Sequence, residues 1–232
     1  MDRQNLVLVP GLICTDALFA PQIDALSPYA EIMVADHRRH DSMAAIAAAI
    51  LEEAPRFFAL GGLSMGGYIA FEIMRQAPER VTKLALMDTS ARPDTDEQRK
   101  RRAGLIDQAD HGKFKGVTRG LLPLFIHEDR LHDAPLVETI MQMAKDTGRE
   151  AFKRQQTAIM GRADSRPLLP SIQCPTVVVC GRQDALTPLA LAQEMADGIP
   201  AARLEIVEDC GHLPTLERPE AVNAILKDWL VG

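Results

Sequence analysis

The 232-residue sequence has little of what marks metal-binding, disulfide-rich or membrane-spanning proteins. Its four cysteines show no C-x-x-C spacing, so neither a zinc site nor a disulfide framework is predicted, and a reducing compartment is the simpler expectation. No apolar run approaches the ~20 residues of a membrane span. The first apolar run, residues 6–9, is too short for the core of a signal peptide. We therefore expect a cytoplasmic protein without a membrane partner.

An excess of positive charge is also lacking. The net charge of −6 disfavours nucleic acid as a partner, because phosphate binding needs clustered Lys and Arg. The one basic run, residues 99–102, follows Asp94, Asp96 and Glu97 and is interpreted as a solvated helix face. No internal repeat or low-complexity segment is visible, and the length suits one large α/β domain.

Short apolar runs that alternate with helical patterns predict an α/β fold. Strands are predicted at residues 6–9, 31–36, 57–60, 83–88, 176–180 and 203–207, and helices at residues 17–26, 42–53, 65–76 and 219–230. Strands that are apolar throughout suit a parallel sheet covered by helices on both faces. The alternation predicts a right-handed, mostly parallel sheet flanked by helices.

Residues 95–166 interrupt this alternation. They show helical periodicity without strands, with helices predicted at residues 99–110, 113–122, 136–145 and 150–160. A helical stretch of this length between two strands is interpreted as a lid inserted into the sheet domain. The predicted organisation is a core of residues 1–94 and 167–232 with a lid of residues 95–166.

The stretch Gly62-Leu63-Ser64-Met65-Gly66 lies between a predicted strand and a predicted helix. A G-x-S-x-G pattern in this setting is typical of a nucleophile elbow. The sharp turn holds the serine hydroxyl clear of its own backbone, and its strain calls for neighbours without a Cβ, which Gly62 and Gly66 provide. We therefore predict Ser64 as a nucleophile.

A serine hydroxyl is too weak an acid to attack at neutral pH unless a base and an orienting carboxylate are in reach. His212 follows the predicted strand at residues 203–207, and the carboxyl ends of parallel strands are where α/β sheets build their sites. We predict His212 as the base. Two carboxylates also follow strand ends, Asp184 and Asp88, and both keep the chain order Ser, Asp, His. Asp184 is preferred, and Asp88 is either the acid or a turn cap.

Three motifs in this order resemble the α/β-hydrolase superfamily, and more narrowly its small prokaryotic serine esterases and C–C hydrolases with a helical lid. The motifs are the elbow at residues 62–67, residues 180–184 with Thr187-Pro188, and Gly211-His212 with residues 217–220. The resemblance spans nearly the whole chain. It implies an α/β-hydrolase fold in which Ser64 is the nucleophile, His212 the base and Asp184 the acid.

The resemblance also implies an oxyanion hole. Members of the superfamily often carry His-Gly at the end of the first core strand, just before the residue whose backbone N–H completes the hole. This chain has Pro10-Gly11 there. The match implies that the N–H groups of Leu12 and Met65 form the hole. The missing histidine removes a usual loop-positioning contact without removing the donor.

The function expected from these residues is hydrolysis of a small-molecule carboxylic ester through an acyl-enzyme on Ser64, with no metal and no organic cofactor. An alternative on the same triad is a C–C bond hydrolase or lyase of small-molecule metabolism. A third is a non-catalytic ligand-binding protein that retains the pocket. The sequence does not determine the natural substrate or the oligomeric state.

The most apolar part of the predicted lid is residues 120–126. Leu124 and Phe125 have two interpretations. They pack the lid helices onto the sheet domain, as any amphipathic helix must. Alternatively they face the cleft and, with Ile13 opposite, wall an acyl pocket that prefers uncharged groups.

Overall fold

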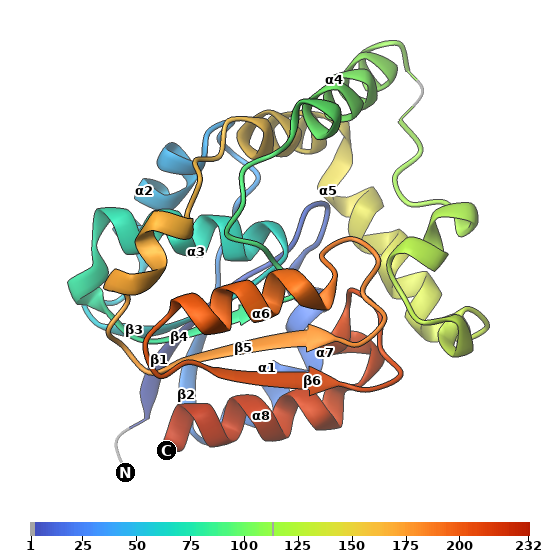
Figure 1. Ribbon diagram of the computed structural model, residues 1–232. Coiled ribbons are helices and arrows are strands. Elements are labelled where there is room, and N and C mark those ends of the chain that lie inside the picture. Colours follow the sequence, from blue (N-terminus) through green and yellow to red (C-terminus); the bar gives the residue numbers. More distant parts are fainter. Residues whose placement is uncertain (1–2, 113) are drawn as a thin grey trace.

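The computed structural model describes residues 3–112 and 114–232 (Figure 1). Six strands form one sheet in the order β2-β1-β3-β4-β5-β6, and every neighbouring pair is parallel. The strands are β1 (Gln4–Val9), β2 (Ala30–Val34), β3 (Phe58–Leu63), β4 (Val81–Met87), β5 (Thr176–Gly181) and β6 (Arg203–Val207). Each overlaps a predicted strand, so the predicted parallel sheet is confirmed.

Helices cover both faces of the sheet (Figure 1). They are α1 (Ala20–Leu26), α2 (Met43–Glu53), α3 (Met65–Gln76), α4 (Asp96–Asp110), α5 (Ala134–Met160), α6 (Leu189–Gly198), α7 (Pro214–Glu217) and α8 (Pro219–Val231). Short 3-10 helices lie at η1 (Asp16–Phe19), η2 (Pro78–Arg80), η3 (Arg119–Leu124), η4 (Glu128–Arg130) and η5 (Arg166–Ser171). No helix in the described part of the chain is both long and apolar enough to cross a membrane.

Alternate strand residues face opposite sides of the sheet, as the two-residue period of a strand requires. Leu6 and Leu8 of β1 pack in one buried cluster with residues of α1 and α8. Val7 and Val9 of the same strand pack in the other cluster with residues of α2, α3 and α6. Since both of its faces are buried here, the end of β1 reads as a continuous apolar run, and this is why the strand was predictable.

The connection from β4 to β5 carries α4 and α5, and its described residues contain no strand. At Gly148 the backbone of α5 leaves helical geometry, with φ 74° and ψ 170°. The two helices expected at residues 136–145 and 150–160 are the two halves of α5 on either side of this break.

The helix expected at residues 113–122 is wrong. Lys113 lies outside the described residues, residues 114–118 are irregular, and the short η3 follows. Gly116 has φ 63°, a left-handed conformation that ends a helix. The expectation of four helices in this connection thus overstated its regular structure.

Helix α6 had no counterpart among the predicted helices. It begins directly after Pro188, and no side chain caps its first turn, so the usual polar start signal is missing. The basic run at residues 99–102 is also only partly a solvated face. Arg99, Lys100 and Arg101 are exposed, but Arg102 is half-buried and donates to the buried Asp94 at 2.8 Å.

Candidate active site

Because all six strands run in the same direction, their carboxyl ends meet at one edge of the sheet. The loops that follow β1, β3, β4, β5 and β6 at this edge carry Leu12, Ser64, Asp88, Asp184 and His212 respectively. The residues singled out in the sequence therefore come from five separate loops. The fold gathers them in one place.

Ser64 lies between β3 and α3 with φ 55° and ψ −113°, a conformation that a residue with a side chain rarely adopts. The turn is tight because its two glycines make close backbone contacts, Gly62 with Gly66 and Gly66 with Val9. A Cβ on Gly62 would lie 2.3 Å from the Gly66 carbonyl oxygen, and a Cβ on Gly66 would lie 1.9 Å from the Val9 carbonyl oxygen. Both glycines are needed for close approach, and the second places the start of α3 against the end of β1.

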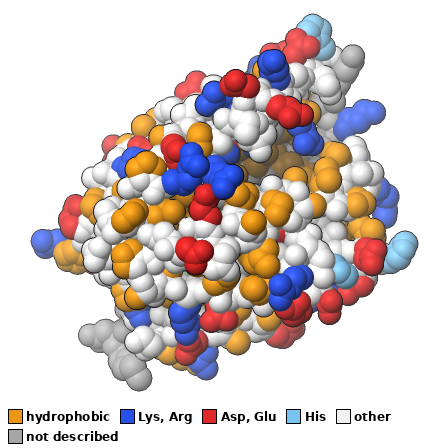
Figure 2. Space-filling model, in the orientation of Figure 1, with side chains coloured by type: hydrophobic (Ala, Val, Ile, Leu, Met, Phe, Trp, Pro, Cys, Tyr) orange, Lys and Arg blue, Asp and Glu red, His pale blue; other side chains and the backbone are white. Residues whose placement is uncertain are grey.

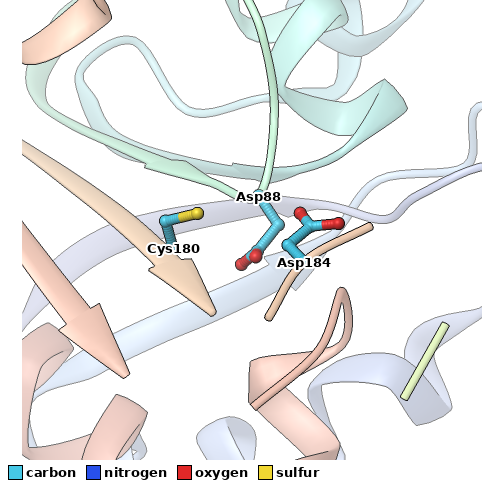
Figure 3. A group of neighbouring side chains, drawn as sticks. All are labelled: Asp88, Cys180 and Asp184. Atoms are coloured by element: carbon cyan, nitrogen blue, oxygen red, sulfur yellow. The ribbon is translucent and has the colours of Figure 1, made fainter. Parts of the chain in front are cut away.

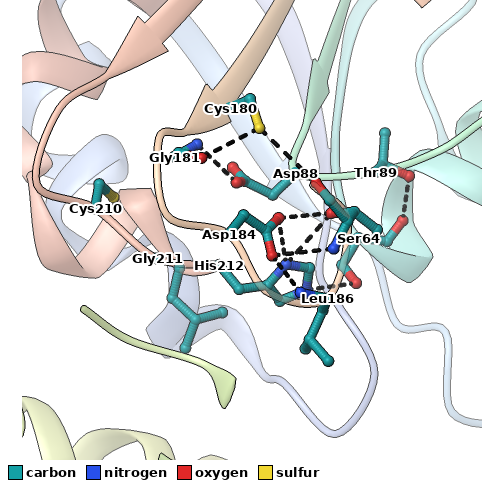
Figure 4. A network of polar contacts seen from close by, with 12 residues as sticks. Ser64, Asp88, Thr89, Cys180, Gly181, Asp184, Leu186, Cys210, Gly211 and His212 are labelled. Carbon is teal, nitrogen blue, oxygen red and sulfur yellow. Dashed lines mark hydrogen bonds and ion pairs between the residues drawn. The ribbon is translucent and has the colours of Figure 1, made fainter. Parts of the chain in front are cut away.

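Ser64, His212 and Asp184 form one chain of hydrogen bonds (Figure 4). His212 Nε2 lies 2.9 Å from Ser64 Oγ, and His212 Nδ1 lies 2.8 Å from Asp184 Oδ2. His212 and Asp184 are both buried, whereas Ser64 is partly accessible. The Nδ1 contact with a carboxylate puts the proton on Nδ1, which leaves Nε2 free to accept the serine proton.

The carboxylate of Asp184 is stabilised as an anion. Its Oδ1 accepts from the backbone N–H groups of Leu186 and Thr187, and its Oδ2 accepts from Thr187 Oγ1 at 2.6 Å. Burial opposes ionisation, but His212 and the hydrogen bonds from Thr187 outweigh it and hold the pKa of Asp184 below its ordinary value. Asp184 is thus charged at neutral pH.

Asp88, the other carboxylate considered, does not bond to His212. It accepts from the N–H of Gly181 on the neighbouring strand at 2.9 Å, and its Oδ2 has no hydrogen-bond partner among the described residues. Burial and the nearby charge of Asp184 raise the pKa of Asp88 well above its ordinary value. Both effects favour the protonated, neutral form of the carboxyl group, and neither role expected for it, triad acid or turn cap, matches its contacts.

One possible metal-ligand atom from each of Asp88, Cys180 and Asp184 lies within 4.8 Å of the other two (Figure 3). Such a group has the composition of a metal site. However, both oxygens of Asp184 already accept hydrogen bonds, and Asp88 Oδ1 accepts from Gly181. Burial and the nearby charge of Asp184 raise the pKa of the Cys180 thiol, which favours its protonated form. These contacts are more consistent with a protonated Asp88 and no bound metal ion than with a metal ion held by the three residues.

The N–H groups of Leu12 and Met65 have no acceptor within residues 3–112 and 114–232. Met65 is the first residue of α3, where the free N–H groups of a helix attract negative charge. Ile13, next to Leu12, is buried and has φ 54°. Both predicted donors are thus without a hydrogen-bond partner among the described residues.

The loop that carries His212 is held by Glu217, whose motif was noted in the sequence without a role. The fully buried Glu217 carboxylate accepts from the backbone N–H groups of Gly211, Leu213 and His127, the last at 2.6 Å. The N–H of His212 itself donates to the Phe125 carbonyl at 2.9 Å. The β4–β5 connection is therefore tied directly to the histidine loop.

Of the expected pocket residues, Ile13 belongs to a buried cluster against which Leu12 and Phe125 pack. Leu124 is half-buried and packs in neither of the two clusters. Figure 2 shows a hollow below α4 with hydrophobic side chains inside it. Phe125 contacts the histidine loop through its backbone carbonyl, which accepts from the His212 N–H.

The neutral Asp88 predicts a pH-dependent stability. A carboxyl with a raised pKa in the folded chain retains a proton that the unfolded chain releases above about pH 4, so this group destabilises the fold as pH rises towards its folded pKa. Each raised pKa unit corresponds to about 1.4 kcal/mol, or roughly 3 to 6 °C in Tm for a chain of this size. Asp88→Asn removes the effect.

We therefore expect the Tm of Asp88→Asn, minus that of the wild type, to increase as the pH rises above about 4 in thermal denaturation. Asp24→Asn, at an exposed position, is the matched control for the general effect of removing one acidic side chain. A constant difference for Asp88→Asn would mean that Asp88 is ionised in the fold.

Comparison with known proteins agrees with the fold. A family model described as "Alpha/beta hydrolase family" matches residues 6–225. A pimeloyl-[acyl-carrier protein] methyl ester esterase from Aromatoleum aromaticum is 27% identical over the whole of both chains. A thermophilic esterase from Thermogutta terrifontis superposes with a TM-score of 0.88 at 29% identity and covers 98% of this chain and 89% of its own.

An enol-lactonase from Burkholderia xenovorans has the same fold, with a TM-score of 0.89 at 24% identity over 100% of this chain and 93% of its own. The match of the family model over nearly the whole length, on a sheet and an elbow of the expected form, identifies the chain as a hydrolase. It belongs to the alpha/beta hydrolase family.

Proposed function

We propose that the protein hydrolyses carboxylic esters with small, uncharged acyl groups through an acyl-enzyme on Ser64. The observation that carries this proposal is the hydrogen-bonded chain from Ser64 Oγ through His212 to the ionised Asp184. A serine activated by a histidine that a carboxylate orients is the arrangement that acyl transfer needs.

In this reaction Ser64 Oγ attacks the ester carbonyl carbon while His212 Nε2 takes the hydroxyl proton. The carbonyl oxygen becomes an oxyanion, which the N–H groups of Leu12 and Met65 stabilise. His212 then gives its proton to the leaving alcohol, and the acyl group stays on Ser64. A water molecule repeats the attack with His212 as base, which releases the carboxylic acid and restores the serine.

Asp184 keeps the imidazole in the productive tautomer and stabilises the imidazolium that forms in each step. Its own hydrogen bonds to Leu186 and Thr187 fix the direction of the carboxylate. The relatives from Aromatoleum and Thermogutta are named as esterases. Their names support an ester as the substrate class, in preference to a C–C bond or a non-catalytic ligand.

Residues 95–166 act in this proposal as a lid over the site. Phe125, which follows Leu124, lies beside the histidine loop, and the hollow below α4 carries hydrophobic side chains (Figure 2). Apolar walls favour uncharged acyl groups, and each buried methylene adds up to about 0.8 kcal/mol of binding. The lid thus supplies the preference for the acyl group, and the sheet edge supplies the chemistry.

Replacing the nucleophile tests the function directly. Ser64→Ala removes the attacking oxygen, so we expect ester turnover to fall by about 10⁴-fold or more and labelling by a fluorophosphonate probe to disappear. The exposed Ser171→Ala should be labelled and active like the wild type. Turnover above a tenth of the wild-type rate in Ser64→Ala would exclude Ser64 as the nucleophile.

The two carboxylates predict opposite outcomes. Asp184→Asn donates to His212 Nδ1 instead of accepting, so the imidazole takes the wrong tautomer and kcat should fall by roughly 10³- to 10⁴-fold. Asp88→Asn keeps a neutral side chain of the same shape and should change kcat far less. Steady-state kinetics on a p-nitrophenyl ester compares them. The reverse ranking would make Asp88 the orienting acid.

The acyl pocket predicts a chain-length optimum. We expect kcat/KM to rise from acetyl to butyryl or hexanoyl p-nitrophenyl esters and then to fall, as the pocket fills. Phe125→Ala enlarges the pocket and should move the optimum to longer chains. Leu121→Ala, at an exposed position of η3, which ends just before Phe125, is the control. An optimum that does not move in Phe125→Ala would leave this side chain a packing role only.

A further inference from the structure

The loop after β1, which carries Leu12, adopts a strained conformation. Ile13 has φ 54°, and a β-branched residue rarely adopts such a value unless its surroundings impose it. The superfamily's usual histidine before the glycine is replaced by Pro10 in this chain. Other groups must therefore hold the loop, and two buried side chains contact its backbone.

The first of these side chains is His37, which follows β2 and is 1% exposed. Its Nε2 lies 2.9 Å from the Gly11 carbonyl oxygen. A carbonyl oxygen can only accept, so Nε2 carries the proton and donates it. Burial lowers the pKa of His37 to about 4, so the ring is neutral at neutral pH and this tautomer is maintained.

The bond to Gly11 also orients Leu12, because the Gly11 carbonyl and the Leu12 N–H belong to the same peptide group. A trans peptide is planar, and its C=O and N–H point in opposite directions. His37 and the N–H of Cys14 hold the carbonyl from one side, at 2.9 and 3.1 Å. The Leu12 N–H is thereby directed to the other side and has no acceptor within the described residues.

The second side chain is Gln155 of α5, which is fully buried. Its Oε1 accepts from the Ile13 N–H at 3.1 Å. Its Nε2 lies 3.1 Å from His37 Nε2 and makes no hydrogen bond there, because with the His37 proton on Nε2 both nitrogens are donors. It therefore holds the next peptide group of the loop and packs against the first side chain. Gln155 comes from the β4–β5 connection, 142 residues after Ile13 in the sequence.

We propose that His37 and Gln155 are positioning residues of the oxyanion hole, which fix the peptide groups on both sides of Leu12. Gln155 also makes the direction of the Leu12 N–H depend on α5 lying in place, so that the hole is complete only when this part of the lid is docked. The inference rests on the proposed function, in which Leu12 is an oxyanion donor.

Gln155→Met tests the link to α5 because it keeps the shape of the side chain and removes the acceptor for Ile13. The matched control is Gln156→Met, the next residue, which is also buried but whose Oε1 accepts from Arg102. For each variant we would measure Tm, kcat and KM on p-nitrophenyl butyrate, and the inhibition constant of a trifluoromethyl ketone, which forms an oxyanion on Ser64.

Loss of an oxyanion donor costs about 10²- to 10³-fold in kcat. A misdirected donor is weakened and not deleted, so we expect Gln155→Met to lose roughly 10- to 100-fold in kcat with KM within about threefold. The ketone should bind more weakly by a similar factor, because it also needs the hole. Gln156→Met should match the wild type in both measurements at a comparable Tm.

His37→Leu removes the donor to Gly11, and His37→Gln returns an N–H at about the same distance along the side chain. We expect His37→Leu to lose kcat and ketone affinity together and His37→Gln to recover most of both. General destabilisation would lower Tm without this parallel loss and recovery. If His37→Leu does not fold, the comparison of Gln155→Met with Gln156→Met decides.

Two failures have different signatures. An active wild type whose Gln155→Met variant keeps the kcat and ketone affinity of Gln156→Met would overturn the positioning role and leave the esterase function intact. A wild type that neither turns over esters nor reacts with a fluorophosphonate would overturn the proposed function, and the positioning role with it.

Discussion

The site depends on one close contact between two backbone segments. The first turn of α3 lies against the end of β1 so tightly that a Cβ on Gly66 would come within 1.9 Å of the Val9 carbonyl oxygen. The turn after β3 therefore lies directly beside the loop after β1. Ser64 and the free N–H of Met65 come from the first of these segments, and Leu12 comes from the second. A larger residue at position 66 would separate the nucleophile from half of its proposed oxyanion hole.

The two buried aspartates show how local contacts give the same side chain different states. They follow neighbouring strands, and their carboxylate oxygens lie close to each other and to the sulfur of Cys180 (Figure 3). Asp184 accepts from two N–H groups and a hydroxyl and faces His212, so it is ionised. Asp88 accepts from one N–H group and faces the charge of Asp184, so it retains its proton. The ionised group is the one that can orient the histidine.

Much of the fold was predictable because short, mostly apolar runs alternate with helical patterns, and the elbow was predictable because G-x-S-x-G lies between a strand and a helix. Local signals failed where they were weak: α6 lacks a capping side chain, and Gly116 interrupts the helix expected at residues 113–122. Asp184 and Asp88 could not be separated by position, since both follow a strand end. Only the contacts of Thr187 and Gly181 distinguish them. The pairing of Gln155 with Ile13 has no local signal, because it depends on how a distant helix packs.

Glu217 has a consequence for how the motif around it should be interpreted in relatives. Its carboxylate accepts hydrogen bonds from three backbone N–H groups, those of Gly211, Leu213 and His127. Glutamine at this position would turn an NH₂ group towards some of those donors and leave them unsatisfied in the interior. The requirement for a carboxylate thus comes from main-chain geometry and would persist in a homologue that had lost its serine and all activity. A glutamate at this position therefore indicates how the histidine loop is folded. It does not indicate catalysis, for which the catalytic side chains themselves must be present.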